Sequence, residues 1–215
     1  MKNKNGSAAV TMVHQAIQHD SAHKHVSGSA KYVDDIAVPP NTLQILLGQS
    51  KFAHAKVLSL DLSRVENFPG VIKVLTAADI PGINDCSPFA GDDPIFADDI
   101  VSYMGQSLFA IIAEDIKIAR TAIGLAVVEY EELPAILTID QALEAGSILG
   151  PPAVIECGSA DAALEKSKNT LEGKFTVGGQ EHFYLEGQAA YALPGEDTDM
   201  VVHCSTQHPT EIQHK

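Results

Sequence analysis

The sequence lacks the residue clusters that several classes of protein require. Its 215 residues carry a formal net charge of -14, and its Lys and Arg residues do not form the basic clusters that bind nucleic acid. No run approaches the ~20 apolar residues of a membrane helix. No long apolar stretch follows Lys2 and Lys4, as a signal peptide would require. We therefore expect a soluble, cytoplasmic chain without a nucleic-acid or membrane partner.

Cysteine is scarce, and its spacing excludes common metal sites. Cys86, Cys157 and Cys204 lie far apart, and none belongs to a C-x-x-C pair, so zinc and iron–sulfur ligation have no support. We expect buried, reduced thiols, as in a cytosolic protein. The chain also lacks the G-x-S-x-G turn of many serine hydrolases.

Histidines and paired aspartates offer only weak candidates for metal ligands. His19, His23 and His25 cluster near the N-terminus, but no cysteine or carboxylate at suitable spacing completes a site. Aspartate pairs at 92–93 and 98–99 lack the pattern of an EF-hand calcium loop. We expect the three histidines to lie on the solvated surface and the aspartates to belong to a solvated acidic loop.

The hydrophobic content of 45% is typical of a globular protein with a substantial core. Apolar alternation and β-branched runs predict strands at residues 43–49, 55–62 and 71–76. In the second strand, Leu58, Leu60 and Leu62 would share one face. Residues 81–94 are rich in Gly, Asn, Asp, Ser and Pro, which predicts a long surface loop.

A strand–helix–strand unit is predicted in the middle of the chain. Residues 108–113 form a short apolar run, typical of a strand covered on both faces. Glu114 and Asp115 suit a helix N-terminus, and residues 127–131 return to strand alternation. The order suggests a βαβ-like unit packed on a mixed sheet, and hence an α+β fold.

The last third of the chain contains the best candidate for a domain boundary. Residues 138–145 predict a short helix ended by Gly146, and residues 150–152, Gly-Pro-Pro, predict the boundary. A second short helix is predicted near 161–168, with extended segments from there to the end. The Gly178–Gly179 pair predicts a tight turn or bulge, because it lacks the spacing of a phosphate-binding loop.

Many phrases of the sequence resemble the molybdenum-binding subunit of the xanthine dehydrogenase and aldehyde oxidase family. Residues 28–35 (GSAKYVDD), 70–82 (GVIKVLTAADIPG) and 128–134 (VEYEELP) resemble its a/b hammerhead domain. Residues 178–186 (GGQEHFYLE) and 204–209 (CSTQHP) resemble the start of its molybdenum-cofactor domain. The bacterial xanthine dehydrogenases with a separate molybdenum-binding subunit look most similar.

The resemblance implies a domain order. We expect a flexible leader at residues 1–18, an a/b hammerhead domain at 19–147, and the truncated start of the molybdopterin-binding domain at 148–215. It also implies that the chain is the N-terminal portion of a larger subunit. The glycine-rich segment, the substrate-positioning arginine and the catalytic glutamate of the family would lie beyond Lys215.

The resemblance further implies the cofactors and partners. Family members hydroxylate an electron-poor carbon with oxygen from water at molybdenum bound to molybdopterin. A glutamate serves as base, and the metal serves as electron sink and Lewis acid. Electrons pass to 2Fe-2S clusters and FAD, which bacteria hold in a partner subunit, so we expect a hetero-oligomer.

One residue of the family's site can be assigned here. Gln207 aligns with the glutamine whose neutral amide donates to an oxo ligand of molybdenum, and we expect no catalytic residue in the chain. Glu181 and Glu186 are expected to be structural, because the family's base belongs to a later segment. His203 and His208 would lie on opposite faces of one strand and would not share a ligand.

Three functional hypotheses remain open. The first is a portion of a xanthine dehydrogenase that oxidises hypoxanthine and xanthine to urate with NAD as acceptor, inactive as an isolated chain. The second is a non-catalytic module that binds the iron–sulfur/FAD subunit. The third is a family member that oxidises an aldehyde or another N-heterocycle, since fold alone does not determine substrate.

Overall fold

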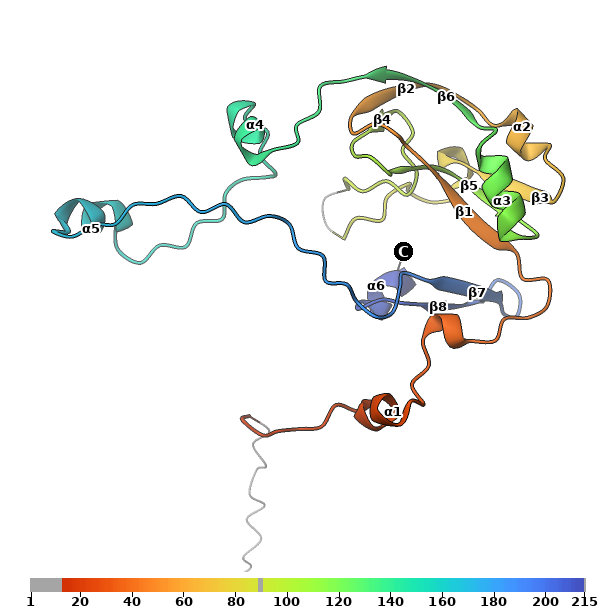
Figure 1. Ribbon diagram of the computed structural model, residues 1–215, viewed down its shortest axis with the longest axis horizontal. Helices are drawn as coiled ribbons and strands as arrows, with labels where there is room; N and C mark the ends of the chain where they lie inside the picture. The colour runs from red at the N-terminus through yellow and green to blue at the C-terminus, as the bar shows by residue number, and fades with distance from the viewer. Residues whose placement is uncertain (1–12, 89–90, 215) are drawn as a thin grey trace, which may run out of the picture. The chain divides into compact units, whose positions relative to one another are not determined.

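The computed structural model describes residues 13–88 and 91–214 (Figure 1). These residues form two compact units. One unit contains the described residues up to Val38 together with His182–Gln213, and the other contains Pro39–Glu181. The predicted leader, residues 1–18, lies largely outside the described residues. Within the described chain, no helix combines the length and the apolar character needed to cross a bilayer.

The larger unit is built on two antiparallel sheets of three strands each. The first has the order β1-β5-β3, with β1 at Gln44–Gln49, β5 at Ser107–Ala113 and β3 at Val71–Leu75. The second has the order β4-β2-β6, with β4 at Ile100–Val101, β2 at Ala55–Asp61 and β6 at Val127–Glu132. The strands predicted from apolar runs and alternation are therefore confirmed.

The prediction of a βαβ-like unit on a mixed sheet is wrong. Helix α3 (Ile116–Ile123) does follow β5 and precede β6, but the two strands belong to different sheets. The reason is that both hydrogen-bonding edges of β5 are already occupied, by β1 and by β3. Strand β6 therefore pairs with β2, and every pairing is antiparallel.

The core of this unit lies between β5 and α3. Leu108 and Ile111 of β5 are at most 1% exposed, and Ala119 and Ala122 of α3 are fully buried. The helix begins where predicted, because the Asp115 carboxylate accepts a hydrogen bond from the backbone N–H of Lys117 at 2.6 Å. The strand is buried on both faces, as its apolar run predicted.

A β-bulge changes which side chains of β2 face the core. Val57 pairs with Tyr130 and Ser59 with Glu129, so Leu58 has no opposite residue. Leu58 is 55% exposed, whereas Leu62 is buried. The predicted shared face of Leu58, Leu60 and Leu62 is therefore wrong. The bulge shifts the phase of the alternation by one residue.

Short helices and turns complete the larger unit. They are α2 (Ser63–Glu66), the 3-10 turn η2 (Ala77–Asp79), α4 (Ile139–Glu144) and α5 (Ala160–Lys166). In α4, Thr138 and Gln141 form reciprocal capping hydrogen bonds. Gly146 follows it with φ of 64°. Both helices predicted in this region are confirmed.

The segment between α4 and α5 and the segment from α5 to residue 181 are largely extended and exposed. Ile155, Leu171 and Phe175 are each at least 93% exposed. Gly178 and Gly179 belong to no strand, turn or positive-φ conformation, so the predicted tight turn or bulge is wrong. A bulge needs a paired strand, and this segment has no strand partner within the described chain.

The described parts of the predicted loop, residues 81–88 and 91–94, are irregular, as predicted, and they contain one of the cysteines. Cys86 is exposed, and its Sγ contacts the Asp93 carbonyl oxygen at 3.2 Å. Partial burial and the nearby Asp93 carboxylate raise the pKa of this thiol. Cys157 is also exposed and Cys204 is half-buried. The expectation of buried thiols is therefore wrong, because these cysteines lie outside the core strands.

The smaller unit contains one hairpin and short helical segments. They are α1 (Ala22–Ser27), the 3-10 turn η1 (Val33–Asp35), β7 (Ala190–Pro194), β8 (Met200–Cys204) and α6 (Pro209–His214). Helix α6 contradicts the prediction of extended structure to the end. Proline occupies its first position, where a missing N–H costs nothing, and the Ile212 N–H donates to the His208 carbonyl at 3.1 Å.

Candidate functional site

The β7–β8 hairpin positions the segment that begins at Cys204, residues 204–209. Ala190 pairs with Cys204 and Pro194 with Met200, so the strands run antiparallel over their full length. At the turn, the Gly195 N–H donates to the Asp199 carbonyl at 2.7 Å, and Asp197 adopts φ of 51°. The hairpin therefore delivers the chain after Cys204 to a fixed place beside the start of β7.

Ser205 extends this pairing one residue beyond β8. Its N–H donates to the Ala189 carbonyl at 3.0 Å, and its Oγ accepts from the Ala189 N–H at 3.0 Å. The same hydroxyl donates to the Gly187 carbonyl at 2.9 Å. The Ser205 side chain thus satisfies backbone groups at Gly187 and Ala189 and fixes the direction in which the chain leaves β8.

Gln207 lies in a bend between two fixed points. On one side is Ser205, and on the other α6 begins at Pro209. The His208 N–H donates to Thr206 Oγ1 at 3.0 Å, which tightens the bend. Gln207 is exposed, and its amide has no hydrogen bond to any described residue. The amide N–H₂ is therefore available to a ligand.

A cavity of about 880 Å³ opens beside this bend, within the smaller unit. Thr206 lines it, but Gln207 does not. One face of the hairpin and α6 supply apolar side chains, and Cys204 and Glu186 add polar groups. Its apolar walls include Val33, Ile36, Met200, Val202 and Ile212. Apolar walls with a few polar groups are typical of small-molecule sites.

The histidines near the phrase do not form a metal site. The His203 ring stacks on Tyr191, with centroids 5.8 Å apart. His208 precedes α6 and is not on the strand, so the prediction of opposite faces of one strand is wrong for it. Among the residues that the structure describes, no three His, Cys, Asp or Glu side chains are placed to hold a metal ion.

Glu186 has a structural contact, as expected. Its Oε1 accepts a hydrogen bond from the Val33 N–H at 2.9 Å, at the start of η1. The carboxylate therefore connects two segments that are far apart in sequence. Glu181 is exposed and belongs to the larger unit.

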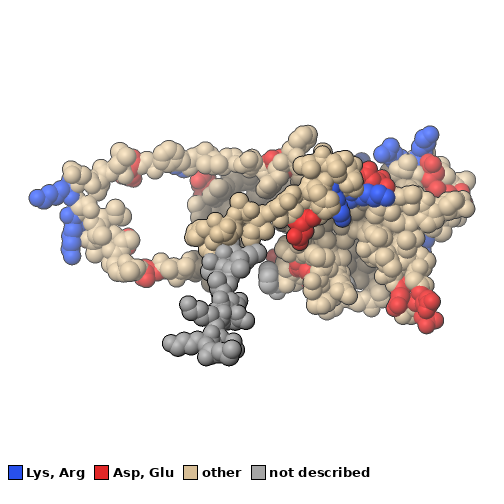
Figure 2. Space-filling view, turned by 90° about the horizontal axis from the view of Figure 1, so that it is seen from below, with Lys and Arg blue, Asp and Glu red and all other residues tan. Residues whose placement is uncertain are grey.

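The arrangement around Gln207 offers a hydrogen-bond donor at the bend. The donor is a neutral amide, which suits an oxo ligand because it adds no acidic proton. The carboxylate of Glu186 is already engaged with Val33. On the face drawn in Figure 2, acidic and basic side chains form small separate groups among uncharged residues.

Sequence reasoning missed the residue that fixes the bend. Ser205 was part of the quoted phrase, but only the hairpin register shows its side chain bridging to Gly187 and Ala189. A serine and a threonine directly after a strand, with proline three residues later, are a local signal for turn hydrogen bonds and a helix start. That signal could have predicted both the bend and α6.

Sequence models of two protein families match the chain. Residues 27–134 match the a/b hammerhead domain of aldehyde oxidase and xanthine dehydrogenase. Residues 147–215 match the molybdopterin cofactor-binding domain. The two matches follow the domain order implied by the sequence phrases, and the second includes Gln207.

Curated relatives agree with these matches. A xanthine dehydrogenase of Dictyostelium discoideum is 39% identical over 199 residues, which are 93% of this chain and 14% of the relative. Aldehyde oxidase 2 of Macaca fascicularis is 40% identical over 203 residues, 94% of this chain and 15% of the relative. The chain therefore spans about one seventh of the length of these relatives.

Solved structures support the same conclusion. The aldehyde oxidoreductase of Desulfovibrio gigas matches with a TM-score of 0.72 and 28% identity over 86% of this chain and 23% of that one. A quinoline 2-oxidoreductase of Pseudomonas putida shares the fold, with a TM-score of 0.74 and 23% identity over 92% of this chain and 27% of that one. The chain is an α+β protein that belongs to the xanthine dehydrogenase and aldehyde oxidase family of molybdenum hydroxylases.

Proposed function

We propose that Gln207 donates a hydrogen bond from its side-chain amide to an oxo ligand of molybdenum in the intact enzyme. The observation that carries the proposal is the exposed Gln207 amide, which has no hydrogen-bond partner among the described residues and lies in a bend fixed by Ser205 and α6. The bend belongs to the segment that matches the molybdopterin-binding domain. When bound, the cofactor supplies two-electron redox chemistry.

The fit between Gln207 and this role is chemical. An amide N–H₂ has two donors, and neither has an acceptor within the described part of the chain. A carboxylate at the same position would present only acceptors to an oxo group and would repel it. Ser205 acts as a positioning residue, because its three hydrogen bonds fix the backbone from which the amide projects.

For the intact protein we propose the oxidation of hypoxanthine and xanthine to urate. Electrons would pass through 2Fe-2S clusters and FAD to NAD in a cytoplasmic hetero-oligomer. The resemblance of the quoted phrases to bacterial xanthine dehydrogenases supports this substrate. An aldehyde is the alternative substrate, because aldehyde oxidase 2 of Macaca fascicularis is as similar to the chain as the xanthine dehydrogenase of Dictyostelium is.

The role of Gln207 can be tested in the holoenzyme with Gln207→Glu. We expect the xanthine-dependent kcat to fall about 10–100-fold, the range seen when a partner of a metal's ligand is removed. Gln188→Glu is the matched control, because Gln188 is also exposed and lies in the same unit. Equal kcat values for Gln207→Glu and the unmodified enzyme would contradict the proposal. Parallel assays with an aldehyde identify the substrate class.

We also propose that the isolated 215-residue chain is catalytically inactive. Glu186, the carboxylate that lines the neighbouring cavity, is engaged with the Val33 N–H. The purified chain should show no xanthine-dependent NAD reduction. Measurable reduction by a preparation free of any longer subunit would refute this proposal and leave the role of Gln207 intact.

An assembly module is the second candidate, and a specific surface favours it. The sheet β1-β5-β3 carries Ile45 and Leu47 on one face of β1, and these are 62% and 44% exposed. Apolar side chains on a sheet face are usually covered in the assembled protein. Molybdenum analysis separates the candidates: a stoichiometric metal content favours a cofactor site, and a metal-free chain that binds the iron–sulfur/FAD subunit favours the module.

A further inference from the structure

A second hollow in the smaller unit gathers basic and hydroxyl side chains. It has a volume of about 560 Å³ and lies between α1 and residues 29–32 (α1 is labelled in Figure 1). The polar groups around it include His23, Lys24, His25, Ser29, Lys31 and Glu186. These residues take no part in the Gln207 bend.

Backbone hydrogen bonds hold the two basic segments in one arrangement. Gly28 adopts φ of 72°, which ends α1 and turns the chain back. The Ser29 and Ala30 N–H groups then both donate to the Lys24 carbonyl, at 2.9 and 3.1 Å. The backbone that precedes Lys31 is thus bonded directly to the backbone of Lys24. Both lysines line the same hollow, and this turn brings their backbones together.

The lysines at this hollow are not neutralised by ion pairs. The chain has 28 Asp and Glu residues against 14 Lys and Arg, so carboxylates are numerous enough to form an ion pair with every Lys and Arg side chain. Within the described chain, ion pairs within 4 Å join Lys73 to Asp79 and Lys174 to Asp140, and neither involves Lys24 or Lys31. Glu186 is the carboxylate at the hollow, and its Oε1 is bonded to the Val33 N–H.

We propose that this hollow, which shares Lys31 and Glu186 with the cavity beside the Gln207 bend, binds a small polyanion of the phosphate class. Each lysine ammonium has three donors and no acceptor, and a phosphate group offers several acceptor oxygens and more than one negative charge. The Ser29 hydroxyl adds a further donor. Two cations on one anion give the attraction that a single exposed ion pair lacks.

Inorganic pyrophosphate is the probe for this site, titrated into the full chain at low ionic strength. We expect saturable binding of one equivalent of pyrophosphate. Calorimetry and the phosphorus NMR signal measure the binding. Lys24→Gln and Lys31→Gln should each weaken binding about threefold to fivefold, and the double variant should weaken it more than either. Glu186→Gln should tighten binding, because it removes a negative charge and keeps an acceptor oxygen for Val33.

Lys168→Gln is the matched control, because Lys168 is an exposed lysine outside the hollow. It should leave the affinity unchanged. The proposal is overturned if pyrophosphate shows no saturable binding, or if Lys168→Gln weakens binding as much as Lys24→Gln does. Far-UV circular dichroism checks that each variant is folded. Lys24 does not line the cavity beside the Gln207 bend, so the result for Lys24→Gln stands apart from the molybdenum proposal.

Discussion

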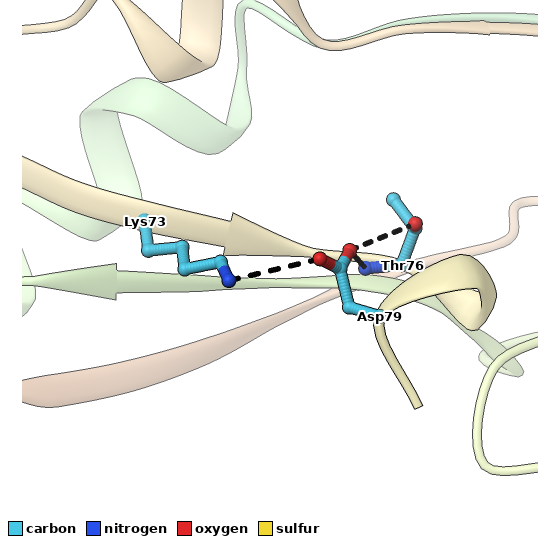
Figure 3. Close-up of polar contacts among 3 residues, drawn as sticks. All are labelled: Lys73, Thr76 and Asp79. Atoms are coloured by element: carbon cyan, nitrogen blue, oxygen red, sulfur yellow. Dashed lines mark hydrogen bonds and ion pairs between the residues drawn. The ribbon is translucent and has the colours of Figure 1, made fainter. Parts of the chain in front are cut away.

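Asp79 illustrates how a single exposed carboxylate fixes a turn after a strand. Its Oδ2 accepts from the Thr76 backbone N–H at 2.9 Å and from Thr76 Oγ1 at 3.1 Å (Figure 3). Lys73 Nζ lies 3.7 Å from Oδ1. The Thr76 backbone hydrogen bond is the main cause that lowers the pKa of Asp79, followed by the Thr76 hydroxyl, and Lys73 contributes less.

We predict that Thr76→Val raises the pKa of Asp79 more than Lys73→Met does, because the hydroxyl bond outweighs the distant ammonium. Carbon-13 NMR titration of the carboxyl group measures both pKa values. A depressed folded-state pKa stabilises the fold at pH values above the unfolded-state pKa. That stability is lost as the pH falls through the folded-state pKa. A larger rise in Lys73→Met than in Thr76→Val would contradict the assignment.

The family resemblance could single out Gln207 as a candidate but could not predict its surroundings. The phrase around it resembled a known family, and that resemblance singled out one amide. The bridge from Ser205 to Gly187 and Ala189 depends on the hairpin register, which pairs residues from both strands. A single sequence does not specify that register, so the positioning residue could not be found from the phrase.

At the scale of elements, the contact between β1 and β5 leaves no room for a side chain at Gly48. A Cβ atom there would overlap the ring of Phe109, which is 2% exposed. The two residues face one another in the antiparallel pair. The glycine is therefore required by close packing across the sheet.

We predict that Gly48→Ala destabilises the protein by about 1–3 kcal/mol, the usual cost of overpacking a core. Urea denaturation followed by circular dichroism measures the change in the free energy of unfolding. Gly82→Ala is the control, because no atom lies within 4 Å of the Cβ position there. Equal stability of the two variants would show that Phe109 can move aside.

The extended segment after α5 should be the first site of proteolysis. Lys166, Lys168 and Lys174 are exposed, and local unfolding costs little where few apolar contacts hold the chain. The ion pair between Lys174 and Asp140 joins two side chains about 80% and 78% exposed, so it adds little protection.

We predict that brief trypsin treatment cuts at these lysines before it cuts at Lys73 in β3 or Arg120 in α3. Mass spectrometry of the first fragments identifies the sites. The strands β1 to β6 should remain in one fragment. Early cleavage at Arg120 would contradict the account, because it would mean that α3 opens before the extended segment.

Strand positions could be predicted from the sequence, whereas strand partners could not. The apolar run at β5 and the alternation at β6 were sufficient for both strands. Their assignment to separate sheets depends on β1 and β3 occupying both edges of β5, which is a long-range property. The bulge at Leu58 likewise arises from pairing with β6, and local alternation carries no signal for it.

At the scale of the whole molecule, the chain combines a packed unit with exposed apolar segments. Val65 and Val101 are fully buried, while Ile155 and Leu171 are fully exposed. The chain also matches only 14% and 15% of the length of the xanthine dehydrogenase and aldehyde oxidase relatives. Both observations support the proposal that activity belongs to a larger assembly, in which these apolar side chains become covered.

The most direct measurement of the central claim is the Mo=O stretching frequency of the oxidised holoenzyme, observed by resonance Raman spectroscopy. If Gln207 donates to the oxo ligand, that hydrogen bond weakens the Mo=O bond, so Gln207→Ala should shift the band to higher frequency. Gln188→Ala, which alters an exposed glutamine in the same unit, should leave it unchanged. An identical frequency in Gln207→Ala and the unmodified enzyme would contradict the placement of this amide at the metal.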